Sequence, residues 1–127
     1  MQLASLYLDI GGEKTLLELV SRFYHLMDTL PEARTIRALH PKNLTKSEEK
    51  LFMFLSGWSG GPPLYSERYG HPRLRARHLP FPISTEERDQ WLLCMNLALD
   101  EVIDSPDISA RLKKQFYDLA DFMRNQD

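Results

Sequence analysis

Apolar residues recur at spacings of three and four along most of the chain, which is the pattern of helices with one buried face. Between residues 13 and 30 these positions include Leu16, Val20, Phe23 and Met27, with polar residues between them. No segment alternates strictly between apolar and polar residues, so no strand is expected. The pattern therefore predicts an all-α chain.

Residues that favour helix starts divide the chain into its elements. A serine or threonine followed three residues later by glutamate forms a capping box, in which each side chain bonds the other residue's backbone N–H. This spacing occurs twice, at Thr45 with Glu48 and at Ser84 with Glu87. Serine directly before proline, as at Ser105, also favours a helix start. Together with the apolar pattern, these starts predict four helices, over residues 13–30, 46–57, 85–104 and 106–124.

Prolines and glycines mark the shorter segments between these helices. Residues 31–39 are expected to form a brief helical piece, and Gly57 is expected to end the helix that begins near residue 46. Residues 59–72 are expected to form a long loop, followed by a short basic turn over 73–79. A plain four-helix bundle has connections of about two to eight residues, whereas this one has about 25. Its length indicates that the segment holds something.

Composition limits the class of protein. The 127 residues are expected to form a single domain, 1–127, with its own core. A formal net charge of −2 argues against a nucleic-acid coat protein, so no nucleic-acid partner is expected. The one cysteine, Cys94, excludes an internal disulfide and sites that need several thiolates, and it is expected to pack. With no apolar run near 18 residues and no signal-peptide pattern, we expect a soluble cytoplasmic protein without a membrane partner.

The densest chemistry lies in residues 71–81, where three arginines and two histidines alternate with leucines. None of the chain's four histidines pairs at the spacing of a zinc protease or a di-iron bundle. One interpretation is a site for phosphate or acidic partners, because arginine pairs with oxyanions. Another is a haem cradle, in which a histidine ligates iron and cations pair with the propionates. A plain solvated basic helix is the third, and the residues alone leave all three open.

Two aromatic residues favour the haem interpretation. Tyr24 lies on the most apolar face of the predicted helix 13–30, and Trp91 lies on the helix that begins near residue 85. In an apolar pocket their O–H and N–H groups need acceptors, which a polarised ligand on iron provides. The alternative for each is a core aromatic whose polar tip reaches the surface.

A series of short motifs resembles the truncated haemoglobins of group II over about residues 9–124. They stand in collinear order with near-constant spacing: Phe23-Tyr24, Leu39-His40-Pro41, Phe54-Leu55, Gly60-Gly61-Pro62, Tyr65-Ser66, Gly70-His71-Pro72-Arg73-Leu74-Arg75, Arg77-His78 and Glu87-Arg88-Asp89-x-Trp91. The run from Gly-Gly-Pro to Arg-x-Arg-His is highly specific. The resemblance implies a truncated globin, a two-over-two helical sandwich around one haem b.

The resemblance also implies roles for single residues. His78 matches the axial ligand of a pentacoordinate iron, and its other ring nitrogen is expected to donate to a backbone carbonyl. Tyr24, Trp91 and His40 match positions beside the gas ligand, and residue 40 is tyrosine or phenylalanine in many members. The expected pocket wall is Phe23, Ser47, Leu51, Phe54, Leu55, Leu79 and Phe81, and the expected propionate contacts are Lys50, Tyr65 and Arg77.

The function implied is binding of haem and then of O₂, CO or NO. Several donors around one ligand predict slow release, which favours handling of oxygen, NO or reactive species over simple oxygen transport. NO dioxygenase and peroxidase-like side activities stay open, as does an unidentified reductase as partner. The alternative is a helical interaction module that binds phosphate or acidic partners through Arg73, Arg75 and Arg77.

Overall fold

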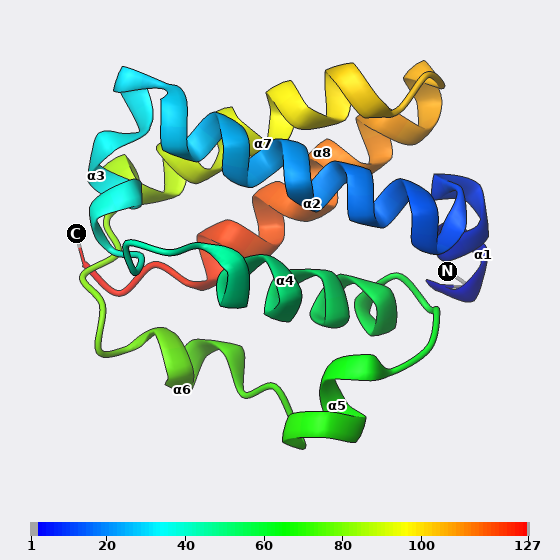
Figure 1. Cartoon of the computed structure of the whole chain (residues 1–127), viewed down its shortest axis with the longest axis horizontal. Helices are drawn as coiled ribbons and strands as arrows, with labels where there is room; N and C mark the ends of the chain where they lie inside the picture. The colour runs from blue at the N-terminus through cyan, green and yellow to red at the C-terminus, as the bar shows by residue number, and fades with distance from the viewer. Residues whose placement is uncertain (1–2, 127) are drawn as a thin grey trace.

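The computed structural model describes residues 3–126, and its ordered elements are all helical (Figure 1). They are α1 (Leu3–Ile10), α2 (Gly12–Thr29), the 3₁₀ turn η1 (Pro31–Ala33), α3 (Arg34–Ala38), α4 (Thr45–Trp58), α5 (Leu64–Tyr69), α6 (Leu74–His78), α7 (Thr85–Val102) and α8 (Pro106–Phe122). No strand occurs among the described residues, which confirms the all-α prediction. Within residues 3–126 no helix is both long enough and apolar enough to cross a bilayer.

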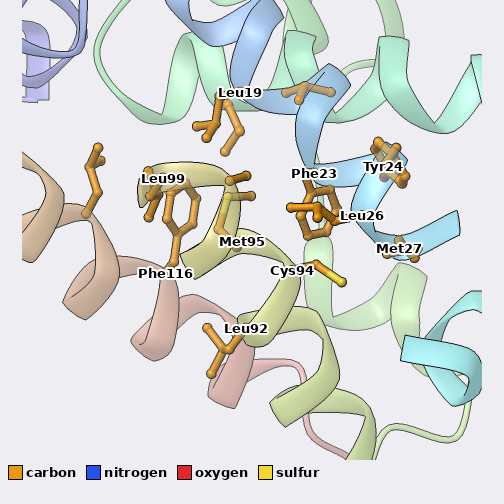
Figure 2. Packing of buried hydrophobic residues seen from close by; sticks show 14 of the residues in the cluster. Leu19, Phe23, Tyr24, Leu26, Met27, Leu92, Cys94, Met95, Leu99 and Phe116 are labelled. Atoms are coloured by element: carbon orange, nitrogen blue, oxygen red, sulfur yellow. The ribbon is translucent and has the colours of Figure 1, made fainter. Parts of the chain in front are cut away.

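The core forms where α2 packs on α7 and α7 packs on α8. Figure 2 shows Leu19 and Phe23 of α2 directed towards Met95 and Leu99 of α7, with Phe116 of α8 beside them. Each of these five side chains is at most 1% exposed. Complete burial of a side chain of this size stabilises the fold by about 2 kcal/mol. These contacts therefore set the position of α2 against α7, from which the functional residues project.

Cys94 lies in the same packed layer, and its side chain is fully buried. Burial raises the pKa of its thiol to about 11, because the low-dielectric core disfavours the thiolate. The thiol therefore stays protonated and acts as a small apolar group, as expected for a packing residue.

One of the two capping boxes is present and the other is absent. Ser84 caps α7, and the carboxylate of Glu87 accepts from the Ser84 backbone N–H at 2.7 Å. Thr45 does not cap α4, because the side chain of Asn43 accepts from the Thr45 N–H at 2.9 Å and makes Thr45 the first helical residue. Ser105 caps α8 as expected.

The connection before α7 contains more helix than the sequence analysis predicted. The expected loop over 59–72 contains α5, which begins directly after Pro63, a residue that favours a first turn. The prediction that Gly57 ends α4 is wrong, since α4 continues to Trp58. Gly57 instead permits close packing, because a Cβ there would lie 3.3 Å from the Pro63 Cα. The basic turn forms α6, residues 31–39 divide into η1 and α3, and α1 was missed.

Helix α4 separates α2 from this connection. It packs on α2 and on α5, and Figure 1 shows α5 and α6 on a long excursion away from the α2 side of the molecule. The chain then returns to α7 close to the C-terminus. Residues of both α4 and α6 line the cavity that this path encloses.

Candidate functional site

A cavity of about 530 Å³ is enclosed mainly by α4, α6, α7 and the corner after α3. Eleven residues that the sequence analysis singled out line it: Tyr24, His40, Ser47, Lys50, Leu51, Phe54, Tyr65, Arg77, His78, Phe81 and Trp91. They come from segments far apart in the sequence, which the fold brings to one wall. Apolar side chains make up most of that wall.

Three of the predicted pocket residues lie elsewhere. Phe23 and Leu55 are fully buried in the core instead of lining the cavity, and Leu79 is 58% exposed at the surface. Each is the sequence neighbour of a residue that does line the cavity. Successive positions on a helix are rotated by about 100° and cannot share a face. These three predictions are therefore corrected: Phe23 and Leu55 support the wall from behind, and Leu79 lies outside it.

Helix α8 and two polar residues of α7 also contribute to the wall, which was not predicted from the sequence. The other residues on the wall are Ile36, Leu39, Pro41, Leu74, Ile83, Glu87, Arg88, Leu119, Ala120 and Met123. The apolar stripe of α8 was visible in the sequence, but only tertiary packing decides that its last turns face the cavity. Arg88 was part of a quoted motif without a role, and it is held by Asp121 at 2.7 Å.

His78, the last residue of α6, presents one unblocked ring nitrogen to this cavity. Its Nδ1 lies 2.6 Å from the Leu74 carbonyl oxygen. A carbonyl can only accept, so Nδ1 carries a proton, and in the neutral form of the ring Nε2 keeps a free lone pair. The predicted hydrogen bond to a backbone carbonyl is thus present. A half-buried neutral imidazole with a free Nε2 is the state in which histidine ligates a metal.

Tyr24 and Trp91 both line this cavity, and each side chain carries one hydrogen-bond donor. Tyr24 is 7% exposed, and burial raises the pKa of its phenol far above the ordinary value, with the charge of Glu48 adding to the effect. The phenol is therefore neutral and keeps its proton. Neither the Tyr24 hydroxyl nor the Trp91 N–H donates to any residue that the structure describes. Polar groups this close to the core normally have a partner, so both donors are available to a ligand in the cavity.

His40 offers an acceptor at neutral pH, where the sequence analysis treated it as another donor. Its Nδ1 lies 2.9 Å from the Ile36 carbonyl oxygen, which leaves Nε2 with the free lone pair. Its ring packs edge to face against Tyr24, with a centroid distance of 5.9 Å. Burial lowers the pKa of His40, against the raising effect of the Ile36 hydrogen bond, and electrostatic interactions with Arg37 and His78 lower it further. The ring is therefore neutral near pH 7 and becomes a donor from Nε2 only in acid.

Cations stand at the open edge of the cavity. The Lys50 ammonium lies 5.4 Å from the centre of the Tyr69 ring, and the Arg77 guanidinium lies 5.9 Å from that of Tyr65. Both basic side chains are exposed. Neither forms an ion pair with a carboxylate in the described part of the chain. Both charges are therefore available to an anionic group bound at this edge.

These features fit a haem better than a bare metal ion. Within residues 3–126 no group of three or more histidine, cysteine or acidic side chains could hold a metal ion. A haem iron brings four nitrogen ligands of its own and needs one axial residue, which His78 can provide. The mostly apolar wall suits the macrocycle, and the free cations at the edge suit its carboxylates. The cavity and its donor set thus fit the group that the sequence resemblance implied.

Comparisons with known proteins give a consistent result. The family profile of bacterial-like globins matches residues 5–125. The group 2 truncated hemoglobin YjbI of Bacillus subtilis is 47% identical over 91 residues, which are 72% of this chain and 67% of that protein. The solved group II 2-on-2 hemoglobin of Agrobacterium tumefaciens is 48% identical with a TM-score of 0.93, over 96% of this chain and 95% of the other. The truncated oxygen-avid haemoglobin of Bacillus subtilis is 42% identical with a TM-score of 0.85, over 94% and 98%. The predicted two-over-two helical sandwich is thereby confirmed.

Proposed function

The chain belongs to the bacterial-like globin family, and from this premise we propose that it binds one haem b through His78 and holds O₂, CO or NO beside Tyr24 and Trp91. Its family and its truncated haemoglobin relatives make it a haem-based protein that binds gas ligands. When bound, haem would supply an iron with one axial histidine and one open position for a diatomic ligand. The observation that carries the proposal is the free Nε2 of His78 on a mostly apolar cavity wall.

The hydrogen bond behind His78 supports its role as axial ligand. The Leu74 carbonyl accepts from Nδ1–H at 2.6 Å. Such a bond holds the ring in one orientation, fixes the tautomer and makes Nε2 more basic. Apolar neighbours on the wall, among them Leu74 and Phe81, keep water from competing for the same nitrogen. His78 is thus proposed to be oriented for ligation before haem binds.

Tyr24 and Trp91 are proposed to stabilise the gas ligand by donating to it. Both donors lack a protein acceptor in the described part of the chain, so donating to a ligand breaks no existing hydrogen bond. The raised pKa of Tyr24 keeps its hydroxyl protonated over the whole physiological range. O₂ is polarised more strongly than CO when bound to haem, and these donors are expected to favour it. The similar haemoglobin of Bacillus subtilis is oxygen-avid, which is consistent with this proposal.

His40 is proposed to make ligand release depend on pH. At neutral pH its Nε2 accepts, and after protonation the same nitrogen donates. A third donor beside the ligand should slow O₂ release as the pH falls below the ordinary titration range of histidine. His40→Phe should remove that dependence while keeping the edge-to-face contact with Tyr24. A wild-type O₂ release rate that is flat between about pH 5 and 8 would contradict this role.

The cations at the edge are proposed to hold the haem carboxylates. Lys50 and Arg77 are the candidates because neither has a carboxylate partner among the described residues. Tyr65 stands between the Arg77 guanidinium and the Phe54 ring, at centroid distances of 5.9 and 6.5 Å. The same ring can therefore line the apolar slot and direct its hydroxyl to the edge. Exposed ion pairs contribute only about 0.2–1 kcal/mol each, so single losses should affect haem binding modestly.

Handling of oxygen, NO or reactive species is proposed over simple oxygen transport. Two unpartnered donors at one ligand predict slow release, and a transport protein must release its cargo readily. Repeated turnover with NO or peroxide would need electrons from a reductase, which is the protein partner expected for such reactions. A pulse of NO added to the O₂-loaded protein, with nitrate measured against time, tests this chemistry directly.

An absorption spectrum separates the haem proposal from the rival interaction module. The purified chain, supplied with haem, is expected to show a Soret band that shifts when CO is added to the reduced protein. The rival function would use Arg73, Arg75 and Arg77, of which Arg75 already donates to two carbonyl oxygens at the end of α8. A chain that binds no haem but retains phosphate would support the module and end the haem proposal.

A further inference from the structure

The C-terminal residues 123–126, called here the C-terminal clasp, run alongside the segment that leads from α6 to α7. Figure 1 shows the C-terminus beside this segment. The clasp follows α8, whose last turn is anchored to α7 because Asp121 accepts from Arg88 at 2.7 Å and from Arg124 at 2.9 Å. The clasp therefore begins from a fixed base on the packed part of the molecule.

One side chain of the clasp makes three hydrogen bonds to the segment that follows the predicted axial ligand. The Asn125 Nδ2 donates to the carbonyl oxygens of Phe81 at 2.9 Å and of His78 itself at 3.3 Å. The Asn125 Oδ1 accepts from the Ile83 N–H at 3.0 Å. The backbone N–H groups of Asn125 and Gln126 also donate to the Ile83 carbonyl, at 2.9 and 3.1 Å. Asn125 thus uses both ends of its amide to bind the chain over residues 78–83.

A second contact joins the clasp to the middle of α6. One guanidinium nitrogen of Arg75 donates to the carbonyl oxygens of Phe122 at 2.6 Å and of Arg124 at 3.0 Å. The last carbonyls of a helix lack helical partners and carry partial negative charge, so a cation is favoured there. Arg75 also lies over the Phe122 ring, 5.8 Å from its centre. Helix α6 is therefore held by the end of α8 through both Arg75 and the His78 backbone.

Helix α6 needs such support because its own structure provides little. It has five residues, and none of them is buried. Arg73, directly before it, has φ of +46°, in the left-handed region that residues with a side chain disfavour. A helix this short is not stable by itself, because the cost of forming its first turn is not recovered. Contacts from outside α6 must therefore fix the direction in which the His78 ring points.

We propose that Asn125 is a positioning residue for His78, through which the C-terminal clasp fixes the orientation of the axial imidazole. The proposal rests on the function of His78 given above. Asn125 does not touch the ring. It binds the backbone carbonyls of His78 and Phe81 and the N–H of Ile83, so it sets the rotation of the end of α6 about its axis.

Two substitutions of Asn125 and one matched control test the proposal. Asn125→Ala removes all three side-chain hydrogen bonds, whereas Asn125→Asp keeps the acceptor for Ile83 and replaces the two donors with an oxygen. Gln126→Ala is the control, because Gln126 is the next residue of the clasp and its side chain bonds to no described residue. The readouts are the iron–histidine stretching band of the ferrous haem-loaded protein, by resonance Raman, and the rate of haem transfer to apomyoglobin.

Both Asn125 variants should show a shifted and broadened iron–histidine band. Haem transfer should be about tenfold faster, a factor that corresponds to about 1.4 kcal/mol. Gln126→Ala should match the wild type in both readouts. An iron–histidine band of wild-type position and width in both Asn125 variants would overturn the proposal even if haem transfer accelerated, because the clasp would then only stabilise the fold.

The failure of the clasp can be told apart from failure of the proposed function. An iron–histidine band that persists in His78→Ala would contradict the function of His78, whatever the Asn125 variants show. Loss of that band in His78→Ala, with unchanged bands in both Asn125 variants, would contradict the clasp alone.

Discussion

Replacing Tyr24 with phenylalanine removes one hydroxyl from the cavity wall and keeps the ring. The ring packs edge to face on Phe23 at a centroid distance of 4.9 Å, a contact that phenylalanine retains. Because the hydroxyl donates to no residue that the structure describes, its loss leaves no protein acceptor unpaired. The free energy of unfolding of the haem-free protein should therefore change by less than about 0.5 kcal/mol.

The effect on ligand release should be much larger. A hydrogen bond to a charged or strongly polarised acceptor contributes about 1.5–3 kcal/mol, and about 1.4 kcal/mol corresponds to a factor of ten. Tyr24→Phe should therefore raise the O₂ dissociation rate about 10- to 100-fold. CO is a weaker acceptor, so its release should change less. Large kinetic change with unchanged stability is the signature of a donor that serves the ligand and not the fold.

Stopped-flow displacement of O₂ by CO measures this rate. Tyr117→Phe is a matched control, because Tyr117 is 46% exposed on α8 and does not line the cavity. That control should release O₂ at the wild-type rate. Trp91→Phe should also accelerate release, and the double variant should fall short of the product of the two factors, because both donors share one acceptor. Wild-type O₂ release in both Tyr24→Phe and Trp91→Phe would show that these aromatics only pack.

The pKa of His40, the packing at Gly61 and the haem cavity each predict an effect on stability. Because burial lowers the pKa of His40, below about pH 6.5 the unfolded chain binds a proton that the folded chain does not bind, so the free energy of unfolding should decrease as the pH decreases below that value. Thermal denaturation of the haem-free protein should show a shallower decrease for His40→Phe than for the wild type. Parallel curves for the two proteins would refute this. A Cβ at Gly61 would lie 2.3 Å from the Tyr7 ring, so Gly61→Ala should lower the free energy of unfolding in urea by about 1–3 kcal/mol. The double variant with Tyr7→Ala should lose less than the sum of the two single losses. Strict additivity would mean that the two residues do not clash. Removing haem should lower the thermal midpoint by several degrees, because tight binding to the native state alone stabilises it by several kcal/mol; equal midpoints for the two forms would contradict a haem-filled cavity.

Local signals in the sequence predicted the long helices, and tertiary packing decided what they could not. The apolar spacing over residues 13–30 corresponds to α2 within one residue at each end. Ser84 and Ser105 cap their helices as predicted because no nearer side chain competes for the same N–H groups. At the start of α4 the Asn43 carboxamide accepts from the Thr45 N–H instead, so Thr45 does not cap the helix. Gly57 does not end α4, because the neighbouring Pro63 packs against its bare Cα and the helix continues.

Residues inside and outside the quoted family motifs line the cavity, among them Ser47, Lys50, Leu51 and Phe81, which belong to no motif. Tyr24, His78 and Trp91 all line the cavity, and each belongs to a quoted motif. Neighbours in those motifs, such as Phe23 and Leu55, lie in the core because adjacent helical positions face different ways. Contacts between segments distant in sequence left no local signal. The hydrogen bonds that Asn125 makes to His78 and Phe81 are of this kind, because these residues stand 47 and 44 positions earlier in the chain. No spacing rule could have found them.

Chemical rescue at position 78 tests the central claim most directly. His78→Ala removes the proposed iron ligand and leaves a space beside the Leu74 carbonyl that free imidazole can enter. The variant is expected to bind haem weakly, with a displaced Soret band and no iron–histidine stretching band, and added imidazole should restore both. His71→Ala, a change at an exposed histidine outside the cavity wall, should leave the wild-type spectrum intact. A His78→Ala protein that retains haem with the wild-type spectrum in the absence of imidazole would contradict the account.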